Sequence, residues 1–213
     1  MSRAVVKPGI AVLALASFAT ACATPPPPPV AVMAPPAGPC DESMGIEAPL
    51  LLEVPNPNRA SVMAADVTAE TACWSNPETG INTPYVIAQL PQSESQLLLT
   101  VIAPLDRLRT LATDVRTLDA NGQVVRHFER DRFVTLGDGY SLQLTPRAEE
   151  AMVAVSVDPE LVGLTHESIE MGISTSQVYT GYGTATMYHG HDLQTERSYS
   201  FEGRVVFRLL NVE

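Results

Sequence analysis

The segment from Tyr179 to Tyr199 holds the densest group of side chains that could bind a ligand. Flat aromatic rings stack on the apolar faces of sugars, while imidazole, carboxylate and phenol groups hydrogen-bond to sugar hydroxyls. We therefore expect a binding loop here. The alternative is an ordinary long connection whose tyrosines pack on the edge of the domain. The predicted ligand-binding residues are Tyr179, Tyr182, Tyr188, His189, His191 and Asp192.

His189 and His191 also raise the question of a metal. On a strand, side chains two positions apart point to the same side, so both imidazoles would lie near Asp192. Zinc accepts such ligands, but a complete site needs a further ligand or an open water position. His127 or His166 would have to come close in the fold to supply it. We therefore predict no metal site, and no motif predicts another cofactor.

The chain lacks the motifs expected of an enzyme. No Gly-x-Ser-x-Gly elbow presents a serine nucleophile, and no Gly-rich loop could cradle a phosphate. The carboxylates are scattered, and we expect the pair Glu149-Glu150 to lie in a solvated turn and not to form an acid–base pair. We therefore predict a non-enzymatic protein.

Cys22 is expected to carry a lipid. The chain before it has Arg3 and Lys7, then an apolar run from Ile10 to Phe18, then small residues at 19–21. This order is typical of an export signal, and the run is too short to span a bilayer. A Cys directly after small residues resembles the bacterial lipobox, whose thiol receives diacylglycerol before cleavage. We therefore predict a lipoprotein signal peptide at residues 1–21. The alternative is a soluble periplasmic protein with a free thiol.

A lipid on Cys22 would determine where the protein works. Two or three acyl chains hold firmly to a bilayer, whereas one chain binds reversibly. Ala23 occupies the position of the usual sorting signal, and it is not the Asp that commonly retains lipoproteins in the inner membrane. We therefore expect a lipid-anchored protein of the bacterial cell envelope, with the outer membrane, facing the periplasm, as its location.

The mature chain is strongly acidic. The whole chain has a net charge of −11, and removal of residues 1–21 takes away two basic residues and no acidic one, which gives −13. Such a chain repels polyanions, so we expect no nucleic-acid partner and no basic face that adheres to acidic headgroups. The expected membrane contact is the lipid anchor.

Cys40 and Cys73 remain once Cys22 carries the lipid. An even pair in an exported chain predicts a disulfide, and its loop of roughly 30 residues would constrain the unfolded chain. A metal or redox site would need closer Cys spacing. Trp74 follows Cys73 directly, and we expect its ring to pack near the disulfide as a structural residue.

Composition divides the mature chain into two parts. Residues 22–39 contain the lipid-bearing Cys and a Pro-rich linker, whose run Pro25–Pro29 favours extended polyproline II. At about 3.1 Å per residue, this linker is expected to hold the domain roughly 40 to 50 Å from the lipid surface. A docking role for the Pro-rich run is the alternative. Residues 40–213 have the size of one domain with its own core.

The pattern of residues 40–213 predicts an all-β domain. Asn121-Gly122 between two apolar runs is typical of a tight hairpin, and turn signals recur at short intervals. Long apolar patterns with a helical period are absent; short turns are expected at 105–111 and 158–161. We expect a single antiparallel β-sandwich. The predicted strands are 85–90, 96–102, 114–118, 124–128, 140–144, 152–157 and 203–210.

Several short strings occur in the order found in one known family. They are Thr83–Pro91, Leu97–Val101, Leu118–Asn121, Ala151–Asp158, Val178–Gly183 and the final strand that Gly203 leads. Over about residues 83–210, the chain resembles the maltose operon periplasmic protein family. The resemblance implies a non-enzymatic envelope protein associated with maltodextrin uptake, and it supplies no catalytic residues. The short N-terminal region and the His-rich stretch before the last strand depart from the family pattern.

Two functions are compatible with these expectations. The first is a non-catalytic, membrane-tethered binding or accessory module linked to carbohydrate, with maltodextrin uptake as the case that the resemblance implies. The second is a structural or assembly lipoprotein that docks a protein partner in the cell envelope through a sheet edge or an acidic face. A concave surface shared by Tyr182, Tyr188, His189 and His191 would favour the first function, and burial of these residues would favour the second.

Overall fold

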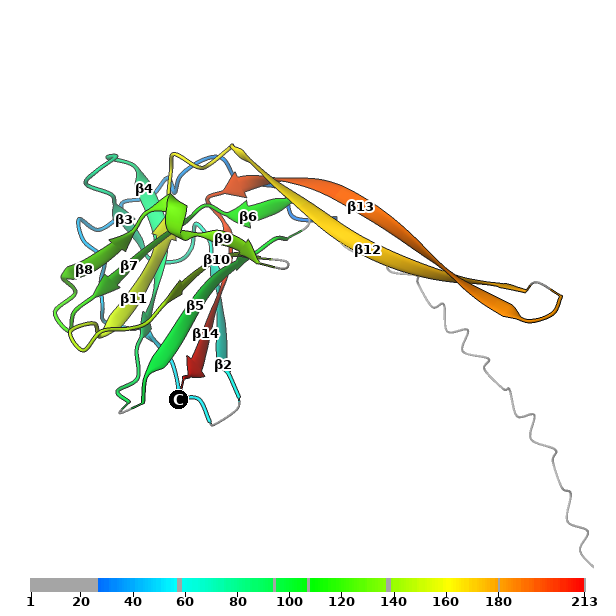
Figure 1. Ribbon diagram of the computed structural model, residues 1–213. Helices are drawn as coiled ribbons and strands as arrows, with labels where there is room; N and C mark the ends of the chain where they lie inside the picture. Colours follow the sequence, from blue (N-terminus) through cyan, green and yellow to red (C-terminus); the bar gives the residue numbers. More distant parts are fainter. Residues whose placement is uncertain are drawn as a thin grey trace, which may run out of the picture.

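The computed structural model describes residues 27–212 except 57–58, 94, 107, 137–138 and 180. The side chains of residues 136, 167–174 and 189–195 are likewise outside the description, as are the predicted signal peptide and Cys22. Two β-sheets pack into a sandwich, and a long two-stranded arm projects from it (Figure 1). The prediction of an all-β fold is confirmed. None of the described residues forms a helix long and apolar enough to cross a membrane.

The first sheet has six strands. Its order is β1-β4-β11-β7-β8, with β3 paired to β4, and every pair except β1–β4 is antiparallel. All residues of β7 and β11 are buried, so both faces of these two strands are covered. The strands are β1 (Leu50–Leu51), β3 (Cys73–Ser75), β4 (Asn82–Gln89), β7 (Thr113–Leu118), β8 (Val124–Phe128) and β11 (Met152–Val157).

The second sheet has five antiparallel strands in the order β2-β14-β5-β10-β9. A short 3-10 helix, η1 (Arg130–Arg132), leads into its edge strand. The strands are β2 (Ser61–Val67), β5 (Leu97–Pro104), β9 (Val134–Leu136), β10 (Gly139–Leu144) and β14 (Gly203–Asn211).

The main core lies between the two sheets. The alternating apolar residues of β14 and β5 point inward from the second sheet, and Phe207 and Leu99 are fully buried. Val115 of β7 and Val155 of β11 meet them from the first sheet. Most of the predicted strands contribute a buried face to this core, which gives them an apolar pattern; β8 contributes only Phe128.

The outer face of the first sheet has a smaller apolar cluster. Trp74, Tyr85 and Leu118 are buried there, and the N-terminal residues Met44 and Ile46 pack against them. The predicted disulfide joins Cys40 to Cys73 beside this cluster, with the two Cα atoms 5.0 Å apart. Trp74 is therefore a packed residue next to the disulfide, as its position in the sequence predicts.

The hairpin between β7 and β8 forms as predicted. Its turn contains Gly122 at a φ of 81°, in the left-handed region that glycine adopts without strain. Asp119 Oδ1 accepts hydrogen bonds from the backbone N–H groups of Asn121 and Gln123, at 2.8 and 2.9 Å. These bonds fix the turn locally, and the resulting register places His127 opposite Arg116.

The arm consists of β12 (Thr165–Tyr179) and β13 (Thr184–Ser200), and the whole length of β12 pairs with Thr184–Ser198 of β13. At about 3.4 Å per residue, the 15 residues of β12 span roughly 50 Å. Within the described part of the chain, strand pairing joins the arm to the body at the end of β13, where Ser198–Ser200 pair with β6 (Arg109–Leu111). Figure 1 shows the arm leaving the sandwich and ending far from it. The expected binding segment, Tyr179 to Tyr199, thus runs from the tip of a long hairpin back to its root.

The Pro-rich linker is docked on the body for much of its length. The backbone N–H of Val32 donates to Ser200 Oγ at 2.9 Å, and its carbonyl accepts from the N–H of Phe201 at 2.9 Å. Arg109 Nη1 donates to the carbonyl of Val30 at 3.4 Å, and Pro36 is buried. The part that can act as a free spacer therefore ends near residue 30, earlier than the expected boundary at residue 39.

Candidate functional site

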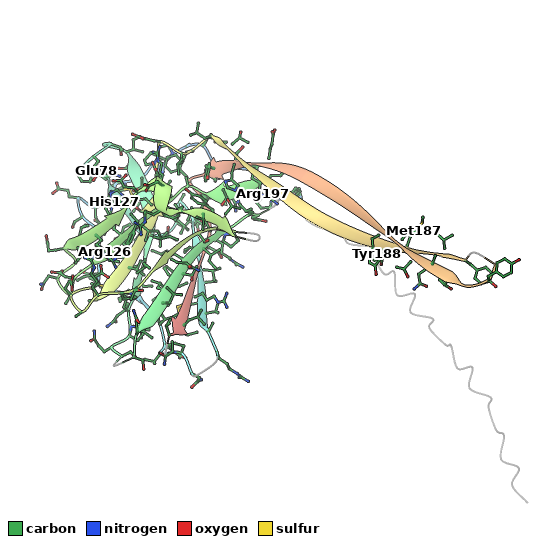
Figure 2. The ribbon with its side chains drawn as sticks, viewed as in Figure 1. Glu78, Arg126, His127, Met187, Tyr188 and Arg197 are labelled. Carbon is green, nitrogen blue, oxygen red and sulfur yellow. A yellow bond between two sulfur atoms is a disulfide. The ribbon has the colours of Figure 1, made fainter. Side chains whose placement is uncertain are left out.

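The three predicted tyrosines lie at the end of the arm and are exposed to solvent. Their exposed fractions are 76% for Tyr179, 104% for Tyr182 and 74% for Tyr188. Figure 2 shows Tyr188 and Met187 on the arm, well away from the sandwich. The alternative expectation was that these tyrosines pack on the edge of the domain, and they do not. They also do not line either of the two cavities of the body described below.

The other three predicted ligand residues belong to β13, and their side chains lie outside the described residues. The backbone register places His189 opposite Ser174, His191 opposite Gly172 and Asp192 opposite Met171. The two histidines that could have completed a metal site have partners of their own, as shown below. Among the residues whose side chains are described, no group of three or more His, Cys, Asp and Glu could hold a metal ion.

His166 helps to fix the root of the arm. It is buried in β12, where its Nδ1 lies 3.0 Å from the Tyr199 hydroxyl and its Nε2 lies 3.2 Å from Thr135 Oγ1. Tyr140 contacts both rings edge-on and stacks on Phe133 at 5.0 Å between ring centroids. Residues from the arm, from β10 and from the end of η1 thus form one aromatic cluster, which sets the direction in which the arm leaves the body.

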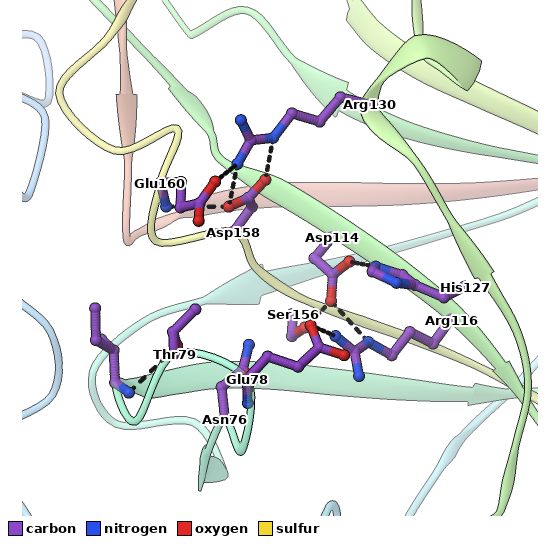
Figure 3. A network of polar contacts seen from close by, with 11 residues as sticks. Asn76, Glu78, Thr79, Asp114, Arg116, His127, Arg130, Ser156, Asp158 and Glu160 are labelled. Atoms are coloured by element: carbon purple, nitrogen blue, oxygen red, sulfur yellow. Dashed lines mark hydrogen bonds and ion pairs between the residues drawn. The ribbon is translucent and has the colours of Figure 1, made fainter.

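A cavity of about 570 Å³ opens on the outer face of the first sheet. We call it the Asp114 pocket. Its volume lies in the range of small-molecule sites. Its walls come from β7, β8, η1, the turn after β3 and the turn after β11. Figure 3 shows the polar side chains that surround it.

Asp114 is the centre of a hydrogen-bond network in this pocket. Its Oδ2 accepts from Arg116 Nε and from Ser156 Oγ, both at 3.0 Å, and its Oδ1 lies 2.5 Å from His127 Nε2 (Figure 3). Burial alone would raise the pKa of Asp114, but the hydrogen bond from His127 and the charge of Arg116 outweigh it and lower the pKa below 3.8. The carboxylate is therefore ionised and holds three side chains in place.

Strand register explains why these residues meet. Asp114 and Arg116 alternate along β7 and so share its outer face with Leu118. His127 lies opposite Arg116 on β8, and Ser156 lies opposite Asp114 on β11. The three strands are neighbours in the sheet, which places their outward side chains within hydrogen-bonding distance.

Two Arg–carboxylate groups flank the opening. Arg116 Nη2 donates to Glu78 Oε2 at 3.1 Å, and the guanidinium lies over the Trp74 ring at 5.3 Å. On the other side, Arg130 donates to Asp158 at 2.6 and 3.0 Å and to Glu160 at 2.7 Å. The pocket lining contains six carboxylates and two guanidiniums; the carboxylates belong to Glu78, Asp114, Glu129, Asp131, Asp158 and Glu160. Because negative charge is in excess, the pocket disfavours anionic ligands.

The geometry of the pocket does not assemble a nucleophile. Ser156 Oγ donates to Asp114 and not to the imidazole of His127, which would have to act as its base. His127 is held by Asp114 through one ring nitrogen and is 35% exposed, so its other nitrogen is available to a ligand. The arrangement provides fixed donors and acceptors for binding.

A second cavity, of about 480 Å³, lies near the turn before β11, and Arg126, Arg132 and Arg147 contribute to its lining. Behind it, Glu150 is buried, with an exposed fraction of 3%. Its carboxylate accepts two bonds from Arg126, one from Thr117 Oγ1 at 2.7 Å and one from the N–H of Arg147 at 2.8 Å. The expectation that Glu150 lies in a solvated turn is therefore wrong, although Glu149 is exposed.

We expect the imidazole of His127 to titrate above pH 6.5 and the imidazole of His166 to titrate below it. The hydrogen bond to Asp114 raises the pKa of His127 above 6.5, while burial and the charge of Arg197 lower the pKa of His166 below it. The stabilising contribution of His127 is thus complete below pH 6.5 and is lost as the pH rises through its folded pKa. His166 instead weakens the fold as the pH falls below 6.5. NMR titration of the imidazole ring protons measures both.

Asp114→Asn provides the control for this titration. It should lower the midpoint of His127 and leave that of His166 unchanged, because Asp114 contacts only the first ring. A shared midpoint for the two histidines in the unmodified chain would contradict the described contacts.

Comparison with family models, curated proteins and solved structures gives no match to this chain. The resemblance to the maltose operon periplasmic protein family therefore stays a prediction.

Proposed function

We propose that this chain is a non-catalytic, lipid-anchored binding module of the bacterial cell envelope, and that the Asp114 pocket takes a neutral carbohydrate. The observation that carries the proposal is the ordered polar network beside an open cavity. Asp114 fixes His127 and Arg116, and Arg116 in turn holds Glu78. Groups held in place before binding lose little conformational entropy when a ligand arrives.

The chemistry of the pocket suits hydroxyl groups. Each sugar hydroxyl is both a donor and an acceptor, and the pocket offers carboxylate acceptors together with imidazole, guanidinium and amide donors. Phe128 and Phe133, each 9% exposed, add a small apolar surface to the lining, which a sugar ring can contact. The excess of carboxylates argues against phosphorylated or acidic sugars.

The export signal and the disulfide support the location in the envelope. A disulfide persists in an oxidising compartment such as the periplasm, and Cys22 follows a signal of the lipoprotein type. With Ala23 after it, the outer membrane is the proposed site of attachment. The resemblance to the maltose operon family makes maltodextrins the first ligands to test, and it supports a role in carbohydrate uptake.

Glu78→Gln should weaken carbohydrate binding about ten-fold, because it replaces an ionised acceptor, and a hydrogen bond to a charged group is worth about 1.5 to 3 kcal/mol. The side chain of Glu78 is 60% exposed, so the change leaves the core intact. Calorimetric titration of the mature chain with maltotriose and longer maltodextrins, followed by a panel of other neutral glycans, measures the dissociation constants.

Glu70→Gln is the matched control, because Glu70 is an exposed carboxylate in the turn before β3 and does not line the pocket. Its dissociation constant should equal that of the unmodified chain. Two results would count against the proposal: no heat with any neutral glycan at millimolar concentration, or equal affinities for the Glu78→Gln and Glu70→Gln variants.

A further inference from the structure

The end of the arm is uncharged in a chain of net charge −11. No Asp, Glu, Lys or Arg occurs from Met171 to Tyr188. We call residues 175–179 and 181–188 the arm tip. Its large apolar side chains are all exposed: Val178, Tyr179, Tyr182, Met187 and Tyr188. Exposed hydrophobic groups that gather at one place on a protein mark an interaction site.

The arm has unpaired strand edges that no charged side chain protects near its tip. Among the residues that the structure describes, β12 pairs only with β13, and β13 has a second partner only at Ser198–Ser200. An open strand edge is a site where another chain can pair, and soluble proteins usually protect such edges with charged side chains. The arm tip has no charged side chain, so a partner that covers it must accommodate exposed Tyr, Met and Val side chains.

The docked linker brings the membrane anchor to the root of the arm. Val32 is bound to Ser200, the last residue of β13, and to Phe201, which follows it, and the carbonyl of Val30 accepts from Arg109 of β6. Eight residue steps separate Cys22 from Val30. Even fully extended, they span at most about 29 Å. The roughly 50 Å arm is longer than this, so its tip can reach the lipid surface whatever the extension of the linker.

We propose that the arm tip is a second membrane contact, in which the tyrosines and Met187 enter the interfacial layer of the bilayer that carries the Cys22 lipid. The proposal rests on the lipid anchor of the proposed function, and it is independent of the carbohydrate ligand. It assigns the exposed aromatic residues to a lipid surface and leaves the pocket on the sandwich body for a soluble ligand.

The chemistry of the tip fits this layer. Tyrosine has an apolar ring and a polar hydroxyl, and it concentrates at the boundary between headgroups and acyl chains. The absence of carboxylates in the tip removes the repulsion that the acidic body meets near anionic lipids. The outward backbone groups of β12 and β13 need hydrogen bonds, which headgroups and water supply and hydrocarbon does not. The tip therefore stays in the interfacial layer.

Tryptophan fluorescence can test this contact. Trp74 is the only natural Trp and is buried, so a Trp introduced by Tyr182→Trp reports on the tip. Val62→Trp, at an exposed position of β2, is the matched reporter on the body. With vesicles of phosphatidylcholine brominated on the acyl chains, we expect quenching and a blue shift for the first reporter and neither for the second.

The affinity for vesicles is measured with the mature chain carrying Cys22→Ser, which has no acyl chains. Combined Tyr179→Ser, Tyr182→Ser and Tyr188→Ser changes should reduce binding to phosphatidylcholine vesicles at least ten-fold. A control with Ser at three exposed apolar positions of the body, Leu51, Val62 and Val134, should bind as the parent does. Adding anionic phosphatidylglycerol should not strengthen binding, because the tip has no basic residue.

Equal binding by the two triple variants, or binding that requires phosphatidylglycerol, would overturn the proposal. The proposal would also be overturned if the fluorescence of the Trp introduced by Tyr182→Trp showed exposure to water with vesicles but shielding in whole envelopes. That result would identify a protein as the partner. The mass of Cys22 in the purified chain tests the anchor separately. An unmodified Cys22 would refute the proposed anchoring while vesicle quenching of the tip reporter still supported a lipid contact.

Discussion

Replacing both Cys40 and Cys73 by Ser should lower the free energy of unfolding by about 3 to 4 kcal/mol. The disulfide closes a loop with a sequence separation of 33 residues, and in the chain-entropy model its loss releases this much conformational freedom in the unfolded chain. The bridge also positions Asp41 beside β3, where its N–H donates to the Cys73 carbonyl at 3.1 Å and its carbonyl accepts from the Ser75 N–H at 2.8 Å. Urea denaturation monitored by circular dichroism gives the value.

The comparison is best made in a chain with Cys22→Ser, so that no other thiol is present. In that background, reductant should destabilise the chain with the disulfide to the level of the Cys40→Ser, Cys73→Ser variant, and it should not affect the variant itself. Hydrogen exchange should increase first around Met44 and Ile46, which cover the Trp74 cluster behind the bridge. A variant as stable as its parent would show that the bridge contributes nothing to the fold.

The strands of the sandwich were predictable because burial leaves a pattern in the sequence. Met152–Val157 and Val124–Phe128 agree with β11 and β8 at both ends, and the Asn121-Gly122 turn fixes the hairpin register. The arm leaves no such pattern. Neither face of β12 or β13 packs on a core near the tip, so polar and apolar residues need not alternate there. Only the Tyr, Thr, Val and Ile content of the segment favours strands.

The Asp114 pocket was not predicted from the sequence for a different reason. Its network joins Asp114, Arg116 and His127 of the β7–β8 hairpin to Glu78 and Ser156, which lie far from them in the sequence. Their contacts depend on which strands are neighbours, and the sequence does not state that β11 lies between β4 and β7. The alternation of Asp114 and Arg116 on one strand can be seen in the sequence. Charged residues alternate in the same way on ordinary solvated sheet faces, so this pattern alone does not indicate a pocket.

Glu149 and Glu150 show most directly how far side-chain roles depend on the fold. Both belong to the same turn before β11, yet Glu149 is exposed and Glu150 is buried. The carboxylate of Glu150 holds Arg126 of β8, Thr117 of β7 and the backbone of Arg147. It therefore ties the turn to the edge of the first sheet. The sequence shows two adjacent Glu residues and does not indicate which of them is buried.

Glu150→Ala should accordingly lower the free energy of unfolding by about 3 to 5 kcal/mol, because it leaves the partly buried Arg126 without its charge partner and the Thr117 hydroxyl without an acceptor. Glu149→Ala is the matched control and should change it by no more than about 0.5 kcal/mol. Burial alone would raise the pKa of Glu150, but the bonds from Arg126 and Thr117 lower it below 4.5. Its stabilising effect is therefore complete above pH 4.5 and is lost as the pH falls through the folded pKa. Urea denaturation across this pH range should show the two variants converging in acid; a gap that stayed constant would mean that ionisation of Glu150 does not matter.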